Sequence, residues 1–504
     1  MRRMPWLVIV SGLAAWACQG VEARSPDSAD LTPEWKALGA PRAQAAGRMP
    51  ALVGRRGSPT AVWGNVAGWN EPGLRPSNRS TAIAVSPDGR QVAVAWLHNA
   101  DPEGPPLGEP TAYASVGRVG GSFATATAIG ARPFAYLPGA LDRVKKYNTA
   151  HNAPVLLPVP GGFLALTMPM NANGYAEMRP PTGYAYAQAA WAGGRWAPPT
   201  LVPLADTRAG SSLSEVSGAR APDGTLHLFG QGHLGRFQGA FAHQRRRAGH
   251  TAWESVTLAE AYRPRGMNYF AEGAGAVTPQ GVLHVAFAWN RQGATPMFGL
   301  YHLMSRDGGK RWCDAAGRPV AVPLRAGVND APAAVVRASL SDRAYAGAAP
   351  GVHGLSLAVA PDGRPVIVRL HQLPHDADRV QARVHLFDGR RWTSIAVGRP
   401  AFWNQGGTAV AVNARTGRVN VLLLDPGGRD RPAQVTRYDA PLTSLRQGRA
   451  AWRSAVVGEA PNATHYGSSL AAAVAPNRAF VFVFEPSYRN PGRVSPVMGQ
   501  APMR

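Results

Sequence analysis

Thirteen histidines are spread along the 504-residue chain, and their positions divide them into two groups. An imidazole exchanges protons near neutral pH, so clustered histidines suit acid–base chemistry. Six histidines fall within β-like segments: His227, His243, His250, His284, His302 and His385. The other seven fall between such segments: His98, His151, His233, His353, His371, His375 and His465. The second group is the better candidate for a reactive site.

The segments around the second group also carry amide, guanidinium and aromatic side chains. Aromatic rings stack on sugar faces, amides bond to hydroxyl groups, and arginine pairs with carboxylate or sulfate. The predicted substrate-binding residues are Asn152, His98, Asn99, Asn171, Trp289, Arg291, His371, Gln372, Trp403 and His465. We therefore expect an acidic polysaccharide as the partner, with no nucleic acid partner and a monomeric chain.

Carboxylates are scarcer in these segments, where Glu215, Glu272, Asp376 and Glu485 are the main ones. Glycoside hydrolysis needs a pair of carboxylates at a set separation. Elimination on a uronate needs instead a cation for the carboxylate, a base for the carbon acid and an acid for the leaving oxygen. The excess of histidine and arginine favours elimination.

No cofactor is predicted from the sequence. A divalent metal bound by His98, His151 and His371 is left open, because imidazole suits zinc, but no short-spaced ligand motif supports it.

The elements that must position these residues are hairpins, because a β-like run, a tight turn and a second β-like run recur along the chain. Proline presets the turn, aspartate or asparagine bonds back to it, and glycine takes the positive φ. The predicted hairpins are Ala82–Trp96, Pro154–Met168, Val216–Phe229, Gly275–Trp289, Leu355–Leu370, Thr408–Leu424 and Ser469–Phe484.

A second strand pair follows most hairpins, as around Trp191–Trp196 and Phe387–Trp392. Two hairpins make a four-stranded blade, and repeated blades close into a propeller. The sequence predicts an all-β fold, a seven-bladed β-propeller of four-stranded antiparallel blades. The segment Ala61–Trp69 would supply the strand that closes the ring. In such blades the loops after the second strand and between blades share one face, which is where the seven histidines fall.

The chain carries 53 Lys and Arg against 30 Asp and Glu, a formal charge of +23 and a pI near 11.0. This balance suits a polyanionic partner. A hydrophobic content of 45% excludes a disordered chain.

The N-terminus reads as an export signal, with Arg2 and Arg3 before a short apolar run. We predict a signal peptide over residues 1–23, a linker over 24–58 and the propeller over 59–504. Cys18 follows small residues and resembles a lipoprotein acylation site, which would attach the chain to a membrane. The expected location is periplasmic, outer-membrane-anchored or secreted. Cys18 and Cys313 are the only cysteines, which argues against a structural disulfide.

A run in the predicted fourth blade carries a family resemblance. Val282–Arg291 leads through Gly299–Met304 to Ser305–Trp312, which matches the pattern S-x-D-x-G-x-x-W, and continues to Leu324. The run resembles the bacterial neuraminidase repeat (Asp-box) propellers of the group that contains ulvan lyases and related uronate-polysaccharide lyases. His151-Asn152-Ala153-Pro154 is similar to the approach to the second blade, where that group carries a catalytic histidine.

The resemblance implies β-elimination on a uronate-containing polysaccharide with His151 as the base. Where the group carries a second histidine, this chain reads Met170–Asn173, which contains no histidine. The group's tyrosine and arginine are likewise absent here, because their positions fall near Ser214-Glu215 and Gly230-Gln231. Only His151 therefore carries over, and Arg265, Tyr269 or Arg291 from the next blade are the candidate stand-ins, of which Arg265 and Tyr269 are taken as catalytic. Two alternatives stay open: a non-catalytic glycan-binding surface propeller, and a sialidase-like glycoside hydrolase using Glu215 with Glu272 or Glu485.

Overall fold

The computed structural model describes a β-strand structure over much of the chain after residue 61. The described residues are 62–65, 81–99, 110–118, 127–129, 135–136, 154–167, 178–179, 185–198, 200–203, 212–234, 237–260, 269–291, 294–326, 328–336, 355–373, 376–402, 407–425, 433–460, 469–474, 479–485 and 497–502. The predicted signal peptide (1–23) and linker (24–58) lie outside them, and those predictions stay untested.

The first three blades follow one another along the chain. Blade one contains β2 (Thr81–Val85), β3 (Gln91–Asn99), β4 (Pro110–Arg118) and β5 (Thr127–Ala128). Blade two contains β7 (Val155–Val159), β8 (Gly162–Thr167), β10 (Ala185–Ala192) and β11 (Arg195–Trp196), and β12 (Thr200–Pro203) also pairs with β10. Blade three contains β13 (Ser212–Arg220), β14 (Leu226–Leu234), β15 (Phe237–Arg246) and β16 (Glu254–Ala259).

The next three blades repeat the pattern. Blade four contains β17 (Tyr269–Val277), β18 (Leu283–Arg291), β19 (Ala294–Ser305), β20 (Trp312–Cys313) and β21 (Pro319–Val320), and β22 (Ala334–Val336) also pairs with β19. Blade five contains β23 (Leu355–Val359), β24 (Pro365–Leu373), β25 (Asp376–Phe387) and β26 (Trp392–Phe402). Blade six contains β27 (Thr408–Asn413), β28 (Arg418–Asp425), β29 (Ala433–Pro441) and β30 (Arg453–Ala460), and the short helix α4 (Leu442–Arg446) follows β29.

A further sheet, called here the terminal sheet, joins the two ends of the described chain. It contains β31 (Ser469–Val474), β32 (Ala479–Glu485), β33 (Val497–Pro502) and β1 (Val62–Asn65), and β1 pairs antiparallel with β33. The strands β6 (Ala135–Tyr136) and β9 (Met178–Arg179) form a separate two-stranded pair.

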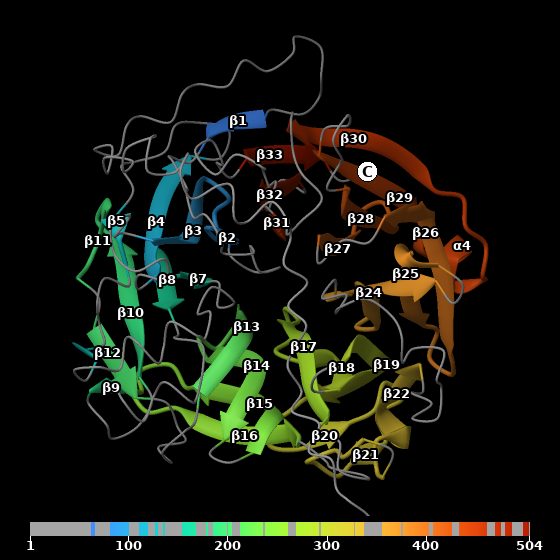
Figure 1. Ribbon diagram of the computed structural model, residues 1–504, viewed down its shortest axis with the longest axis horizontal. Coiled ribbons are helices and arrows are strands. Elements are labelled where there is room, and N and C mark those ends of the chain that lie inside the picture. The colour runs from blue at the N-terminus through green and yellow to red at the C-terminus, as the bar shows by residue number, and fades with distance from the viewer. Residues whose placement is uncertain are drawn as a thin grey trace, which may run out of the picture. The chain divides into compact units, whose positions relative to one another are not determined.

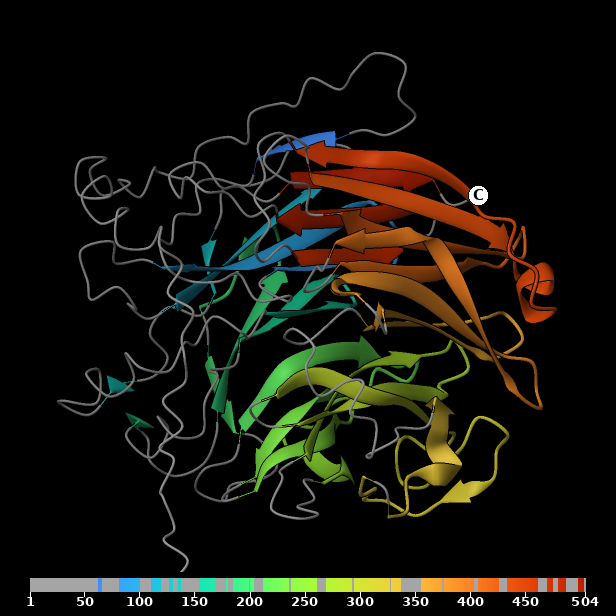
Figure 2. The ribbon, with the colours of Figure 1, turned by 45° about the vertical axis from the view of Figure 1, so that its right-hand side comes forward.

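The blades are set around a common centre, with each first strand innermost (Figure 1). First strands of successive blades contact one another from β2 to β27, and β31 of the terminal sheet contacts both β27 and β2. Figure 2 shows α4 away from that centre, beside the outer strands of blade six. The prediction of an all-β propeller with four-stranded antiparallel blades is confirmed.

The turn between the first and second strands of a blade is specified by its own residues. In blade three the backbone N–H of Thr225 donates to Asp223 Oδ1 at 2.9 Å, and Gly224 has a φ of 87°. In blade one the N–H of Arg90 donates to Asp88 Oδ1 at 3.0 Å. These bonds and the positive φ explain why proline–aspartate–glycine predicted the hairpins.

A tryptophan marks the start of the fourth strand in five consecutive blades: Trp196, Trp253, Trp312, Trp392 and Trp452. Several of these rings pack back onto the preceding blade. Trp312 lies edge-on to His243, with ring centroids 5.6 Å apart, and Trp392 lies edge-on to His302 at 5.7 Å. Trp452 donates its indole N–H to the carbonyl of Ala396 at 2.7 Å. The repeat therefore fastens blades four, five and six each to the preceding blade.

The turn before Trp312 combines hydrogen bonds with close packing. Asp307 Oδ1 accepts from the backbone N–H of Lys310 and of Arg311 at 3.0 and 2.9 Å. Gly309 has a φ of 89°, and a Cβ there would lie 2.3 Å from Cε1 of His243 in the preceding blade. Only glycine fits, because any side chain would collide with the imidazole and strain the backbone.

Hydrophobic clusters fill the spaces between neighbouring blades, and two of them are large. One joins blades three and four around Phe229, Phe241, Phe287 and Trp312. The other joins blades five and six through aliphatic residues of β24, β25 and β28. Among the helices that the structure describes, none is long and apolar enough to cross a membrane.

Candidate functional site

The strand order brings most of the described site candidates to one edge of the sheets. In blades one to six each first strand begins, and each second strand ends, at the same edge, here called the mouth end. The opposite edge, called the turn end, carries the tight turns described above. Loops at strand ends are where propellers and other rigid scaffolds commonly carry functional residues.

Tyr269 and Arg291 are brought together at the mouth end of blade four. Tyr269 begins β17, Arg291 ends β18, and the two are directly opposite each other in the antiparallel register. They are 22 positions apart in sequence, and the tight turn that joins β17 to β18 lies within the predicted hairpin Gly275–Trp289. A phenol and a guanidinium at neighbouring positions can serve as a proton donor and a carboxylate partner.

Three other predicted residues also lie at the ends of second strands. His98 and Asn99 end β3, opposite Thr111 and Pro110 in β4. Gln372 lies one residue before the end of β24. Their backbones lie at the mouth end, and their roles stay predictions.

The remaining predicted residues lie outside the described part of the chain. They are His151 and Arg265 among the catalytic candidates, and Asn152, Asn171, Trp403 and His465 among the binding candidates. Their roles stay predictions.

The interpretation of Trp289 as a sugar-stacking residue is wrong. Its side chain is 0% exposed and packs in the hydrophobic cluster of blades three and four. Its indole N–H donates to Asp330 Oδ2 at 3.1 Å. A ring without exposed surface cannot stack on a sugar, so Trp289 is a core residue of β18.

Pairs of hydrogen-bonded imidazoles recur in three consecutive blades, between the second and third strands. His227 Nδ1 lies 2.9 Å from His243 Nε2 in blade three, and His284 Nδ1 lies 3.1 Å from His302 Nε2 in blade four. In blade five His371 Nε2 lies 2.9 Å from His385 Nε2. Five of these six histidines, all but His371, fall within the β-like segments of the sequence.

The imidazole pairs of blades three and four have the same register. His227 is opposite Arg245, two positions from His243, and His284 is opposite Met304, two positions from His302. This diagonal arrangement lets rings on adjacent strands meet. Two histidines per blade, at separations of 16 and 18, were the available sequence signal.

All six imidazoles have a pKa below the ordinary value, because burial disfavours the charged ring. The pKa is about 4 for His227 and His284 and about 3 for His385. Burial holds the pKa values of His243 and His302 well below the ordinary value too, with their partner imidazoles a further cause. The pairs are therefore neutral near pH 7, and each is joined by a single shared N–H.

The blade-five pair differs because one member is near the mouth end. His371 is half-buried and lies two residues before the end of β24, whereas His385 is 1% exposed. Burial lowers the pKa of His371 well below its usual range, and the guanidinium of Arg369 adds to that effect. His371 is thus a neutral imidazole in positively charged surroundings.

The shared hydrogen bond assigns the protons of this pair. Nδ1 of His385 is buried and has no hydrogen-bond partner. A buried N–H without an acceptor is the costlier arrangement, so we assign the proton of His385 to Nε2, which donates to Nε2 of His371. His371 then carries its own proton on Nδ1, where it can donate to an incoming oxygen.

No group of three or more His, Cys, Asp or Glu residues is placed to hold a metal within the described residues. His151 and the side chain of His98 are outside that part of the structure, so a metal bound by His98, His151 and His371 stays untested.

The carboxylates of the hydrolase alternative are dispersed over three sheets. Glu215 falls in an irregular part of β13, between Ser214 and Ser217, where the register with β14 shifts. Glu272 is opposite Ala288 in blade four, and Glu485 ends β32 of the terminal sheet. No two of them are adjacent in the strand register.

Comparison with known proteins identifies relatives by structure only. No family model matches the chain, and no curated protein matches it by sequence. A polysaccharide lyase of family PL25, an ulvan lyase, superposes with a TM-score of 0.61 at 12% identity over 86% of this chain and 95% of its own. Polysaccharide lyase Uly1 superposes with a TM-score of 0.54 at 11% identity, over 94% and 95% of the two chains. The class of protein is therefore a β-propeller, and the likeness shows the fold alone.

A structure of the PL25 ulvan lyase bound to -[GlcA(1-4)Rha3S]- superposes with a TM-score of 0.60 at 12% identity.

Proposed function

We propose that this protein is an exported polysaccharide lyase that cleaves a uronate-containing polysaccharide by β-elimination. The observation that carries the proposal is the antiparallel pairing of Tyr269 with Arg291 at the mouth end. His371 lies at the same edge of the sheets. The structural likeness to two polysaccharide lyases supports it, since in both cases most of each chain is covered.

We propose that the ring has seven blades, with the terminal sheet as the seventh. The pairing of β1 with β33 supports closure by the N-terminal strand, because this pair ties the first described strand to the last. The contacts of β31 with β2 and β27 support the count. The repeat pattern at Ser305–Trp312 makes the Asp-box propellers the family we propose.

The proposed elimination begins at the carbon next to the uronate carboxylate. His151 removes the proton from that carbon, the electrons form a carbon–carbon double bond, and the bond to the leaving glycosidic oxygen breaks. Tyr269 gives its proton to that oxygen, so the products are an unsaturated uronate and a new sugar hydroxyl. Arg265 and Asn152 bind the carboxylate, where negative charge builds up in the transition state.

Substrate-binding residues surround these groups in the proposal. His98, Asn99, Asn171, Gln372, Trp403 and His465 contact sugar hydroxyls and ring faces, and Arg291 adds a second cation. His371 donates its Nδ1–H to a sugar oxygen, held in that tautomer by His385. A fixed donor loses little entropy on binding, which makes it an effective anchor.

The position of His151 in the sequence fits the role of base. The chain reaches the mouth end of blade two at Pro154, the residue before β7, three positions after His151.

The test replaces His151 with alanine and follows ultraviolet absorbance of the unsaturated product. We expect His151→Ala to lower kcat by at least about a thousandfold, within the range of general base catalysis. The matched control is His250→Ala, because His250 is an exposed histidine in the turn between β15 and β16. Unchanged turnover in His151→Ala would remove His151 from the mechanism.

A glycan-binding propeller without catalysis is the second candidate, favoured by the segments Met170–Asn173 and Ser214-Glu215, which depart from the lyase pattern. It predicts saturable binding of the same polymers with no product. New reducing ends without a rise in the ultraviolet absorbance of unsaturated uronate would instead favour a hydrolase using Glu215 with Glu272 or Glu485.

A further inference from the structure

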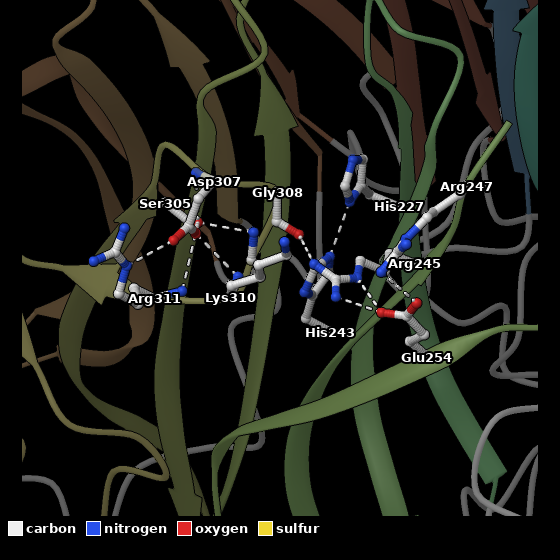
Figure 3. A network of polar contacts seen from close by, with 11 residues as sticks. His227, His243, Arg245, Arg247, Glu254, Ser305, Asp307, Gly308, Lys310 and Arg311 are labelled. Atoms are coloured by element: carbon white, nitrogen blue, oxygen red, sulfur yellow. Dashed lines mark hydrogen bonds and ion pairs between the residues drawn. The ribbon is translucent and has the colours of Figure 1, made fainter.

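The turn end of blades three and four carries more positive than negative charge. Four basic side chains gather there with two carboxylates, Arg245, Arg247, Lys310 and Arg311 with Glu254 and Asp307 (Figure 3), and Arg306 directly precedes Asp307 in the same turn. These seven residues are called the turn-end cluster. It lies at the opposite edge of the sheets from the candidate site.

The two carboxylates already have cationic partners within the cluster. Glu254 accepts from Arg245 Nε at 2.7 Å and pairs with Arg247 Nη2 at 2.9 Å, and Asp307 accepts from Arg311 Nε at 3.0 Å. The hydrogen bond from Arg245 is the main cause of a lowered pKa for Glu254, and Lys310 adds a coulombic contribution. Both carboxylates are thus ionised and occupied.

Two cations in the cluster are left over. Arg306 and Lys310 are exposed, and within the described part of the chain no carboxylate lies within ion-pair distance of either side chain. Arg247 and Arg311 are also 53% and 88% exposed, so an incoming anion can reach them. Arg245 Nη1 donates to the carbonyl of Gly308 at 2.8 Å, which links the turns of the two blades.

We propose that the turn-end cluster is a second docking surface for an anionic polysaccharide, distinct from the candidate active site. Guanidinium groups pair with carboxylate and sulfate in a bidentate manner, and spaced cations on a rigid surface match the repeating charge of such a polymer. The choice of a glycan rests on the proposed function, because the same polymer would then contact both ends of the propeller. Binding at two surfaces would hold the enzyme on its substrate.

A membrane surface fits this cluster less well. Helices that lie on membranes insert aromatic or large aliphatic side chains beside their basic residues. The exposed large hydrophobic residues of the described chain are Val328, Val456 and Val474, and none belongs to the cluster. Trp253 and Trp312, which adjoin the cluster in sequence, are 5% and 2% exposed.

The test measures binding of the full chain to dextran sulfate by calorimetry at several salt concentrations, with uncharged dextran as the blank. We expect the double variant Arg306→Gln/Lys310→Gln to bind about tenfold more weakly and to lower the slope of log affinity against log salt by roughly 1.5, the loss of two ion pairs. The variant Arg306→Lys, which keeps the charge, should bind within about twofold of the unmodified chain.

The matched control is Arg195→Gln/Arg415→Gln, which removes two exposed arginines from the turn ends of blades two and six. It changes the net charge equally but leaves the cluster intact. An equal loss in both double variants would overturn the proposal in favour of net charge, and no loss in either would overturn it as well. Phosphatidylglycerol vesicles that bind through Arg306 and Lys310 as tightly as dextran sulfate does would overturn it in favour of a membrane.

The lyase proposal and this one can fail separately. Arg306→Gln/Lys310→Gln should leave kcat on a uronate polymer unchanged, whereas His151→Ala should leave the binding of dextran sulfate unchanged. If the protein shows no elimination activity but the cluster variant still binds dextran sulfate more weakly, the lyase proposal fails and the docking-surface proposal stands.

Discussion

Each of blades three, four and five contains a hydrogen-bonded pair of histidines, but the surroundings differ. The pairs of blades three and four are fully buried, whereas the pair of blade five reaches the surface. His243, His284 and His302 are at most 1% exposed, and His243 and His302 pack edge-on against the tryptophan of the next blade. His371 is half-buried beside Arg369, near the mouth end. A hydrogen bond between neutral rings thus serves packing where it is sealed, and can present a donor where it reaches the surface.

The pairs His227–His243 and His284–His302 are called the sealed pairs, because all four side chains are at most 1% exposed. Removing one member of a sealed pair should have the largest effect on stability. His302→Ala leaves a cavity and a partner nitrogen without a hydrogen bond, so we expect a loss of about 3–4 kcal/mol in the free energy of unfolding. Urea unfolding measures it, and turnover per folded molecule should be unchanged. His250→Ala, an exposed control, should cost less than about 0.5 kcal/mol. A cost below about 1 kcal/mol for His302→Ala would contradict the structural role.

Acid should destabilise the sealed pairs next. His227 and His284 have a folded pKa of about 4, below the unfolded value of 6.5, so the unfolded chain binds more protons between these values. Stability is therefore complete above about pH 6.5 and falls as the pH drops towards 4, by about 3 kcal/mol for each residue. Thermal unfolding from pH 7 to 4 measures the loss. A variant with both His284→Leu and His302→Leu should show a shallower dependence.

A smaller effect on stability is expected at His371, with a functional effect instead. His371→Ala should cost about 1–2 kcal/mol and raise KM about tenfold, because a substrate donor is lost while the base is untouched. His371→Asn places an amide N–H near the former Nδ1 and should restore KM, whereas His371→Gln should not. Equal KM values for the two amide variants would contradict the assigned tautomer.

The smallest effect is expected at the joint between blades five and six. Arg446 Nη1 and Nη2 donate to the two carboxylate oxygens of Asp362 at 2.6 and 3.1 Å, but Asp362 is 39% exposed. Solvent screens such a pair, so Arg446→Gln should cost at most about 1 kcal/mol. In a thermal melt, a loss as large as that of His302→Ala would mean that this joint is as structural as the sealed pairs.

The turn residues made the hairpins predictable, because proline, aspartate and glycine specify local geometry without help from distant residues. The burial of Trp289 was also readable, since Leu283, Val285, Phe287 and Trp289 alternate along β18 and all four join the core. Trp289 also directly precedes Asn290 and Arg291 at the end of the predicted hairpin, so position alone favours the surface.

The imidazole pairs could not be derived in the same way. They depend on the register between the second and third strands. The segment that connects these two strands sets that register, and its length differs from blade to blade. The pairing of Tyr269 with Arg291 was accessible, because a tight turn fixes the register of its hairpin. Positions joined by long connections, such as His98 and His371, share an edge by topology, but their distances do not follow from the sequence.

The most direct test of the central claim incubates the protein with a panel of uronate-containing polysaccharides and records ultraviolet absorbance of unsaturated uronate. The account predicts a rise with time on at least one polymer, lost in His151→Ala and retained in His250→Ala. A flat trace across the panel, with or without new reducing ends, would contradict β-elimination as the activity of this propeller.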